Sequence, residues 1–145
     1  KPLSPAAALA PLVVAVCKSR PLLAAHPVLR ASAILALCKL MAIDGDFCQA
    51  HLQLLFTLLR DAHAWDASVR SNIIIAIGDL AFRFPNAVEP WTEHIYGTKQ
   101  SGTCLHDADP KVRHDALLVL THLILNDMMK VKGYVSEMVL RLEDP

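Results

Sequence analysis

One segment of fifteen residues occurs three times in this chain, and this repetition constrains the fold more than any other feature of the sequence. The copies cover residues 26–40, 66–80 and 109–123. Each copy places an arginine after Leu or Val, and these arginines (Arg30, Arg70 and Arg113) are 40 and 43 residues apart. A period of roughly 20 to 50 residues is typical of solenoids, in which each repeat buries its apolar face against its neighbours.

The apolar spacing within each copy predicts a helix. In the middle copy, apolar residues recur every three or four positions, at Val69, Ile73, Ala76, Ile77, Leu80, Ala81 and Phe84. This spacing gives a helix one apolar face. Ile74 and Ile75 make the opposite side apolar too, so we expect a helix packed between neighbours. Pro27, Asp66 and Asp109-Pro110 stand where N-caps and first-turn prolines belong.

A second helical pattern precedes each copy at the same period. Its apolar stripes lie within residues 9–16, 47–58 and 88–95, and a fourth lies within 131–142. The sequence therefore predicts an all-α fold, an α-solenoid of antiparallel helix pairs. About three and a half repeats form one segment, with approximate boundaries at 3–43, 46–85, 87–127 and a half repeat at 131–145.

Two features qualify this layout. The glycines of Gly97–Cys104 disfavour a helix, so we expect a loop or frayed end there. Neither the stripe near Leu9 nor the one near Leu142 shows the polar outer face of a terminal capping repeat. We therefore expect the solenoid to continue in both directions.

The formal net charge is zero, from 14 basic and 14 acidic residues, so the chain lacks the overall positive charge typical of nucleic-acid binding. The basic residues before Asp44 nevertheless give the N-terminal end +5 and leave −5 for the remainder. They are Lys1, Lys18, Arg20, Arg30 and Lys39. This end is the better candidate for direct contact with DNA or chromatin.

No pattern in the sequence indicates catalysis or a cofactor. The five glycines form no phosphate-binding loop. The group Cys104, His106, Asp107 and His114 matches no zinc spacing, and Asp44-Gly45-Asp46 lacks the later ligands of a calcium loop. Neither Ser101 nor Cys104 has a recognisable base beside it as a nucleophile would. We expect no enzyme activity, cofactor, metal or small-molecule substrate.

Membrane spans and disulfides are not expected either. No apolar run approaches the roughly 18 residues that a membrane helix needs. The four cysteines form no CxxC pair and lie mostly within apolar helical patterns. A thiol in such a pattern behaves as a small apolar side chain, which favours reduced cysteines in an intracellular protein.

The period and the opening Asp-x-x-Val-Arg resemble the HEAT-repeat family. In that family, the Asp and Arg of successive second helices commonly form a structural ladder along the solenoid. Asp66, Arg70, Asp109 and Arg113 match these positions. The first copy departs from the pattern because His26 stands in place of the Asp.

Longer runs resemble the HEAT-repeat non-SMC subunits of condensin. They cover residues 40–44, 47–50, 70–85, 89–94, 120–128, 131–133 and 142–145. The sixteen-residue run at 70–85 is the most specific. The resemblance implies a non-enzymatic scaffold that binds the kleisin subunit and the SMC ATPase heads in mitotic chromosome condensation. It also implies a nuclear and chromosomal location, with a cytoplasmic pool in interphase.

The sequence suggests where partners bind. Long basic side chains near helix ends stay solvated, so Arg83, Lys111, Lys130 and Lys132 are candidate partner-binding residues, although such residues are also common on an ordinary charged surface. We expect the second helices to form a concave wall that receives a kleisin segment. The alternatives are direct DNA contact through the basic end and a HEAT adaptor that binds another protein. Trp91 lies on an apolar stripe and is expected to anchor the core.

Overall fold

The computed structural model describes residues 5–62, 65–91, 104–125 and 142. Every regular element within these residues is helical. The elements are α1 (Pro5–Lys18), α2 (Arg20–Ala25), α3 (Pro27–Ile43), α4 (Gly45–Asp61), α5 (Ala67–Arg83), α6 (Pro85–Val88), the 3-10 helices η2 (Glu89–Trp91) and η4 (Cys104–His106), and α8 (Pro110–Leu125). The predicted all-α solenoid is confirmed.

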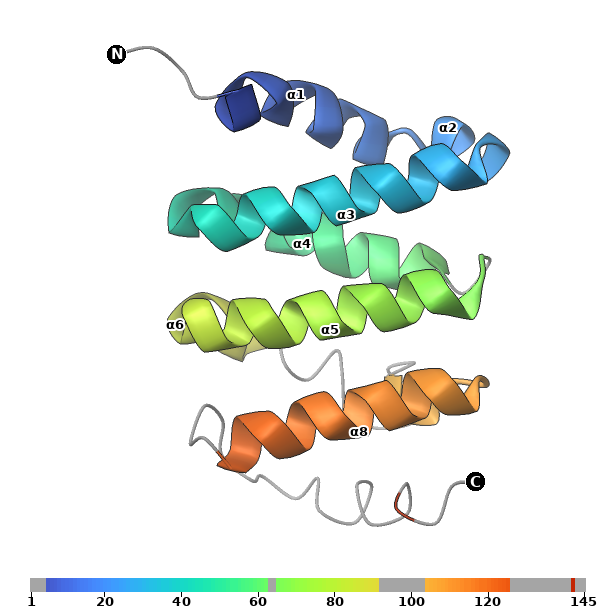
Figure 1. Cartoon of the computed structure of the whole chain (residues 1–145), viewed down its shortest axis with the longest axis vertical. Coiled ribbons are helices and arrows are strands. Elements are labelled where there is room, and N and C mark those ends of the chain that lie inside the picture. The colour runs from blue at the N-terminus through green and yellow to red at the C-terminus, as the bar shows by residue number, and fades with distance from the viewer. Residues whose placement is uncertain (1–4, 63–64, 92–103, 126–141, 143–145) are drawn as a thin grey trace.

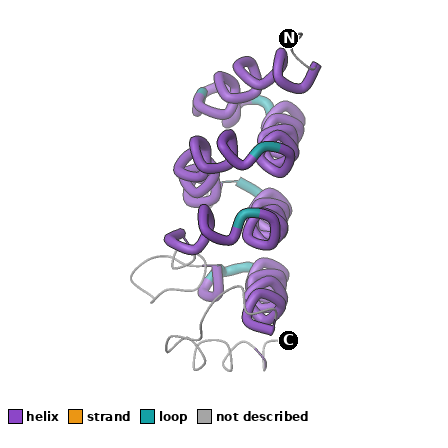
Figure 2. Tube along the Cα trace, turned by 90° about the vertical axis from the view of Figure 1, so that its left-hand side faces the viewer, coloured by secondary structure: helices purple, strands orange, loops and turns teal. Residues whose placement is uncertain are grey.

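The helices stack in two layers (Figures 1 and 2). One layer holds α3, α5 and α8, in which α5 contacts the other two. The other layer holds α1, α4 and α6, in which α4 contacts the other two. The helices of the first layer coincide with the three aligned segments and run in the same direction (Figure 1). Equivalent positions of successive repeats therefore lie one above another.

Some of the sequence-based expectations agree with the structure, or can be compared with it, only in part. The short helix α2, with Pro21 in its first turn, was not predicted. The first helix of the third repeat is seen as α6 and η2, up to Trp91. Residues 97–103 and the half repeat at 131–145, apart from Leu142, lie outside the described residues. The repeat boundaries thus remain a prediction.

Side-chain caps explain where three of the helices begin. The carboxylate of Asp44 accepts the backbone N–H groups of Asp46 and Phe47 at the start of α4, at 2.9 and 3.2 Å. Asp66 accepts the N–H of Val69 at 3.0 Å at the start of α5. Asp109 accepts the N–H of Lys111 at 2.8 Å at the start of α8. Each cap satisfies a donor that the helix itself leaves unpaired.

The core lies between the two layers. In α5 the side chains of Ile73, Ile74 and Ile77 are fully buried, as expected for a helix between neighbours. Ile75 differs from that expectation because it is 45% exposed. The side chain of Ile75 points away from the first-helix layer and is partly exposed to solvent.

The cysteines of the described core are free thiols. Cys17, Cys38 and Cys48 are all buried. Burial raises the pKa of Cys17 to about 11, and burial together with the nearby Cys17 raises the pKa of Cys38 to about 12. Both thiols therefore stay protonated at neutral pH and pack as small apolar side chains.

A buried arginine joins the second and third repeats. The Nε and Nη2 atoms of Arg70 donate to the two carboxylate oxygens of Asp107, at 2.8 and 3.1 Å. Its Nη1 donates to the carbonyl oxygens of Ala62 and Trp65, at 2.9 and 3.3 Å. The side chains of Arg70 and Asp107 are 9% and 1% exposed. One guanidinium thus ties the turn after α4 to the turn before α8.

Arg70 has a partner, Asp107, that the expected ladder of Asp66, Arg70, Asp109 and Arg113 did not include. Asp109 caps α8, where its carboxylate accepts the N–H groups of Lys111 and Val112. Asp107, in the turn between η4 and α8, pairs with Arg70 and also accepts the N–H of Asp109 at 2.9 Å.

The equivalent contact between the first and second repeats is looser. The Nη2 atom of Arg30 lies 4.0 Å from Oδ2 of Asp66, whose side chain is 59% exposed. Arg30 also donates to the carbonyl of Leu23 at 2.9 Å and lies over the ring of Trp65, 4.9 Å from its centroid. Arg113 repeats the same local contact, since its Nη1 donates to the carbonyls of Asp107 and Ala108 at 2.8 and 3.1 Å.

A glycine allows α5 and α8 to pack closely. A Cβ atom added at Gly78 would lie 3.0 Å from Cγ1 of Val119 on α8. Glycine is unfavourable within a helix by about 1 kcal/mol relative to alanine. At this position, however, the missing side chain leaves the room that Val119 fills.

We predict that Asp107→Asn and Arg70→Met each lower the free energy of unfolding by about 3–5 kcal/mol, because each leaves one buried charge without its partner. Lys111→Met is the matched control. It breaks the exposed Lys111–Asp115 ion pair, in which the lysine side chain is 68% exposed, and such pairs contribute about 0.5 kcal/mol or less. Urea unfolding followed by circular dichroism measures all three. Equal losses for Asp107→Asn and Lys111→Met would contradict the ladder described above.

We also predict that Gly78→Leu destabilises the chain by about 1–3 kcal/mol through overpacking against Val119. Gly78→Ala in a Val119→Ala background should instead gain up to about 1 kcal/mol relative to Val119→Ala alone, because the contact is relieved and alanine favours the helix. Thermal unfolding of the parent, Gly78→Ala, Val119→Ala and the variant with both substitutions forms a double-mutant cycle, and Gly78→Leu is measured beside them. A Gly78→Leu protein as stable as the parent would rule out the close approach of α5 and α8.

Candidate protein-binding surface

Each helix of the second-helix layer exposes one large aliphatic residue at the same place in the repeat. Leu35, Ile75 and Leu118 each stand five residues after the repeat arginine and are 53%, 45% and 55% exposed. Figure 1 shows α3, α5 and α8 stacked in parallel. Because the three residues occupy one position of the repeat, we infer that they form a row across the three helices. We call them the aliphatic row. Apolar side chains that recur in register on an exposed face indicate a protein-binding surface.

The apolar surface extends toward the C-terminal ends of α5 and α8. Phe82 and Leu125 both stand twelve residues after their arginine and are 55% and 78% exposed. The ring of Phe82 lies 6.5 Å from that of His122, between centroids. The second-helix face therefore offers apolar contacts at two levels along its helices.

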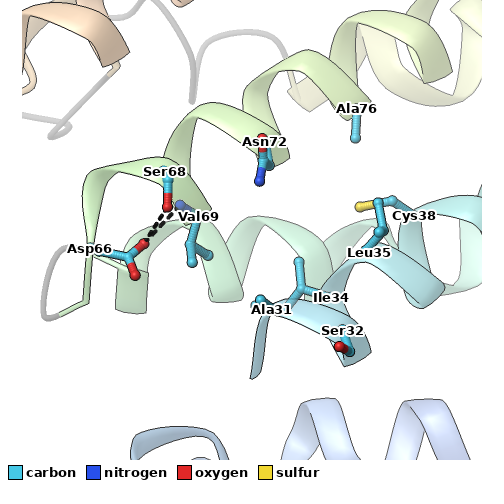
Figure 3. Close-up of a pocket in the computed structure, with 10 residues that line it drawn as sticks. All are labelled: Ala31, Ser32, Ile34, Leu35, Cys38, Asp66, Ser68, Val69, Asn72 and Ala76. Atoms are coloured by element: carbon cyan, nitrogen blue, oxygen red, sulfur yellow. Dashed lines mark hydrogen bonds between the residues drawn. The ribbon is translucent and has the colours of Figure 1, made fainter. Parts of the chain in front are cut away.

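A groove opens between α3 and α5 on this face (Figure 3). It has a volume of about 230 Å³. Its lining combines apolar side chains with polar groups from the start of α5. The lining residues are Ala31, Ser32, Ile34, Leu35, Cys38, Asp66, Ser68, Val69, Asn72 and Ala76. Leu35 thus belongs both to the groove and to the aliphatic row.

The candidate basic residues do not gather at one site. Arg83 is exposed at the end of α5, where its Nη1 lies 3.5 Å from the carbonyl oxygen of Ala42. Lys111 is exposed near the start of α8 and pairs with Asp115. Because α5 and α8 run in parallel, these two residues lie at opposite ends of the two neighbouring helices. Lys130 and Lys132 lie outside the described residues.

The basic N-terminal end is not a continuous positive surface either. Arg30 is buried, and Arg20 pairs with Asp61 at 3.1 Å. Lys18 and Lys39 are exposed, whereas Lys1 lies outside the described residues. Two separate exposed lysines give little of the phosphate neutralisation on which DNA affinity depends.

The residues weighed for chemistry serve structural purposes where the structure describes them. Asp107 pairs with Arg70, and His114 is exposed on α8. Across the described ranges, no three His, Cys, Asp or Glu side chains approach closely enough to hold a metal ion. None of the described helices has the length and apolar character needed to cross a bilayer.

Trp91 packs against the core, as expected. Its ring stacks on that of Phe56, with centroids 5.3 Å apart and an angle of 11° between the planes. This stacking fixes η2 against α4. Trp91 is therefore a core anchor of the third repeat.

Sequence reasoning missed the pairing of Asp107 with Arg70 and two parts of this surface, the aliphatic row and the groove. Aligning the three copies on their arginines gives a signal for the row, because Leu35, Ile75 and Leu118 then fall in one column. No comparable signal identifies the groove. It depends on how closely two helices approach, which the apolar pattern does not specify.

Comparison with known proteins places this solenoid in a family. Residues 68–145 match the family described as non-SMC mitotic condensation complex subunit 1. The chain is 54% identical over 128 residues to condensin-1 complex subunit CAP-D2 of Arabidopsis thaliana, covering 88% of this chain and 8% of that protein. It is 50% identical over 139 residues to condensin complex subunit 1 of both Mus musculus and Homo sapiens, covering 96% of this chain and 9% of each relative.

The chain thus spans less than a tenth of the length of these relatives. The match nevertheless includes α5, α8 and the arginine ladder between them. The chain belongs to the condensin complex subunit 1 family, the non-SMC subunits of the mitotic condensation complex.

Proposed function

We propose that this chain is a non-catalytic scaffold segment of condensin that binds its partners through the outward face of α3, α5 and α8. The observation that carries the proposal is the aliphatic row. Leu35, Ile75 and Leu118 face solvent at one position of three successive repeats, whereas the other exposed large apolar residues described on these helices recur at one position in at most two of them. A surface of this kind is stabilised when another chain covers it.

The geometry suits an elongated partner segment. The row runs along the stack, across the helices, so a helix or extended strand of another subunit lying along it meets one apolar residue per repeat. Among the subunits of condensin, the kleisin and the SMC ATPase heads are the partners we assign. The family supports membership of the complex, and the row supports protein contact at this face.

The same proposal covers where the protein acts in the cell and the presence of further repeats on both sides of this chain. As a condensin segment, the chain acts on chromosomes in the nucleus during mitotic condensation, with a cytoplasmic pool in interphase. It is one stretch of a longer solenoid with repeats on both sides. This is supported by Leu9 and Leu12 of α1, which are 56% and 63% exposed at the outer end of the stack. A preceding helix pair would cover them.

Protein contact is better supported than direct DNA contact. The candidate basic end contains one buried arginine and one arginine paired with a carboxylate. The second-helix face, in contrast, combines exposed aliphatic residues with few unpaired cations. Contacts of the apolar kind keep most of their strength as salt rises, whereas phosphate contacts weaken steeply.

We predict that Ile75→Glu and Leu118→Glu in the full-length subunit each weaken assembly with the other condensin subunits at least tenfold, since each would bury an unpaired carboxylate at the interface. Leu22→Glu is the matched control. Leu22 is 40% exposed on α2, away from the row, and should have no effect. Pull-down of the kleisin and the SMC subunits at two salt concentrations measures the outcome. Parental binding by both folded row variants would overturn the proposal.

A further inference from the structure

The groove between α3 and α5 opens at a place where, between α5 and α8, a valine lies over a glycine. Counted from the repeat arginines, Ala76 of α5 and Val119 of α8 occupy the same position, as do Cys38 of α3 and Gly78 of α5. Val119 fills the space over Gly78. Ala76 and Cys38 line the open groove instead (Figure 3). The smaller Ala76 thus leaves a hollow in the stack.

The floor of the groove is apolar. Ile34, Cys38 and Val69 are buried beneath it, with exposed fractions of 3%, 8% and 5%. Leu35 stands at its edge, half exposed. An apolar cavity of about 150 Å³ holds a molecule the size of benzene. The volume of about 230 Å³ is therefore enough for one large apolar side chain.

One end of the groove carries a negative charge. Asp66 is the charged residue of the lining, and its side chain is 59% exposed. Hydrogen bonds from the Ser68 hydroxyl and the Val69 backbone N–H lower the pKa of Asp66, so the carboxylate is ionised at neutral pH.

Those hydrogen bonds use Oδ1 of Asp66, while its Oδ2 lies 4.0 Å from Nη2 of Arg30. A carboxylate has lone pairs for about four donors. Asp66 can therefore accept a further hydrogen bond from a cation at the end of the groove. Phosphates of a nucleic acid would be repelled at the same place.

We propose that this groove is an anchor site for a protein segment that carries a large apolar residue beside a lysine or arginine. The apolar side chain occupies the space over Ile34, Cys38 and Val69, and the cation pairs with Asp66. Leu35 joins the groove to the aliphatic row, so the segment continues along the row toward Ile75. The inference rests on the proposed function, because it assigns the chemistry of the partner that binds the second-helix face.

Site-specific photocrosslinking in the assembled condensin complex tests this assignment. A photoreactive amino acid replaces Leu35 at the groove in one protein and Leu118 on α8 in another, and mass spectrometry identifies the crosslinked peptides. We expect the Leu35 position to capture a subunit segment with an apolar residue next to a lysine or arginine. If the Leu118 position captures a subunit but the Leu35 position captures nothing, the anchor site alone is overturned. The same holds if the Leu35 position captures a segment without an apolar residue next to a lysine or arginine. No capture at either position overturns the proposed function as well.

Two pairs of variants of the full-length subunit test the same site by affinity. Ala76→Val introduces the valine found at the equivalent position of α8, and we expect at least about fivefold weaker binding to the other subunits. Its control, Ala50→Val on the exposed side of α4, should leave binding unchanged. Asp66→Asn keeps an N-cap acceptor for α5 but removes the charge, with about two- to fivefold weaker binding. Asp46→Asn removes an exposed charge at the start of α4, in the other layer, and should have no effect.

Circular dichroism and the melting temperature confirm that each variant is folded before binding is measured. Parental affinity in a folded Ala76→Val protein would overturn the anchor site. So would equal effects of Asp66→Asn and Asp46→Asn. Both results leave the proposed function intact if the variants of Ile75 and Leu118 still fail to assemble.

Discussion

The buried ion pair between Arg70 and Asp107 fixes the third repeat against the second. Arg70 lies in the first turn of α5, and its guanidinium reaches both the carbonyls in the turn after α4 and the carboxylate that precedes α8. Burial removes competing water, so both charges depend on each other for stability. The turn before α8 is therefore held at a fixed position relative to α5. This position sets the register of α8 along α5.

Because of this register, residues at the same position of successive repeats become neighbours on the exposed face. Leu35, Ile75 and Leu118 are neighbours only because three parallel helices start at corresponding positions. A shift of one helix by a turn, about 5.4 Å, would break the row. The contacts that stabilise the stack thus also position its exposed apolar residues. Structural and binding residues differ in burial but depend on the same repeat spacing.

The sequence predicted the fold well because the repeat and its apolar period report directly on burial. It predicted the helix starts at Asp66 and Asp109 because capping is local. It did not identify Asp107 as the partner of Arg70, since Asp107 lies in a turn that the aligned copies do not include. It placed Ile75 inside because an apolar residue in a repeat was taken as buried, whereas exposure depends on which layer covers it. The basic candidates were chosen by residue type, and charge alone does not locate a surface.

The two junctions of the second-helix layer show why departures from the repeat are informative. Between α5 and α8, a bidentate buried ion pair accompanies close packing of Gly78 and Val119. Between α3 and α5, a 4.0 Å contact to an exposed carboxylate accompanies a groove. An unfilled space lowers stability because its lining loses van der Waals contacts. A chain that closes one junction with valine and leaves the other open with alanine therefore gives up packing where the groove lies, and binding of an apolar anchor restores those contacts.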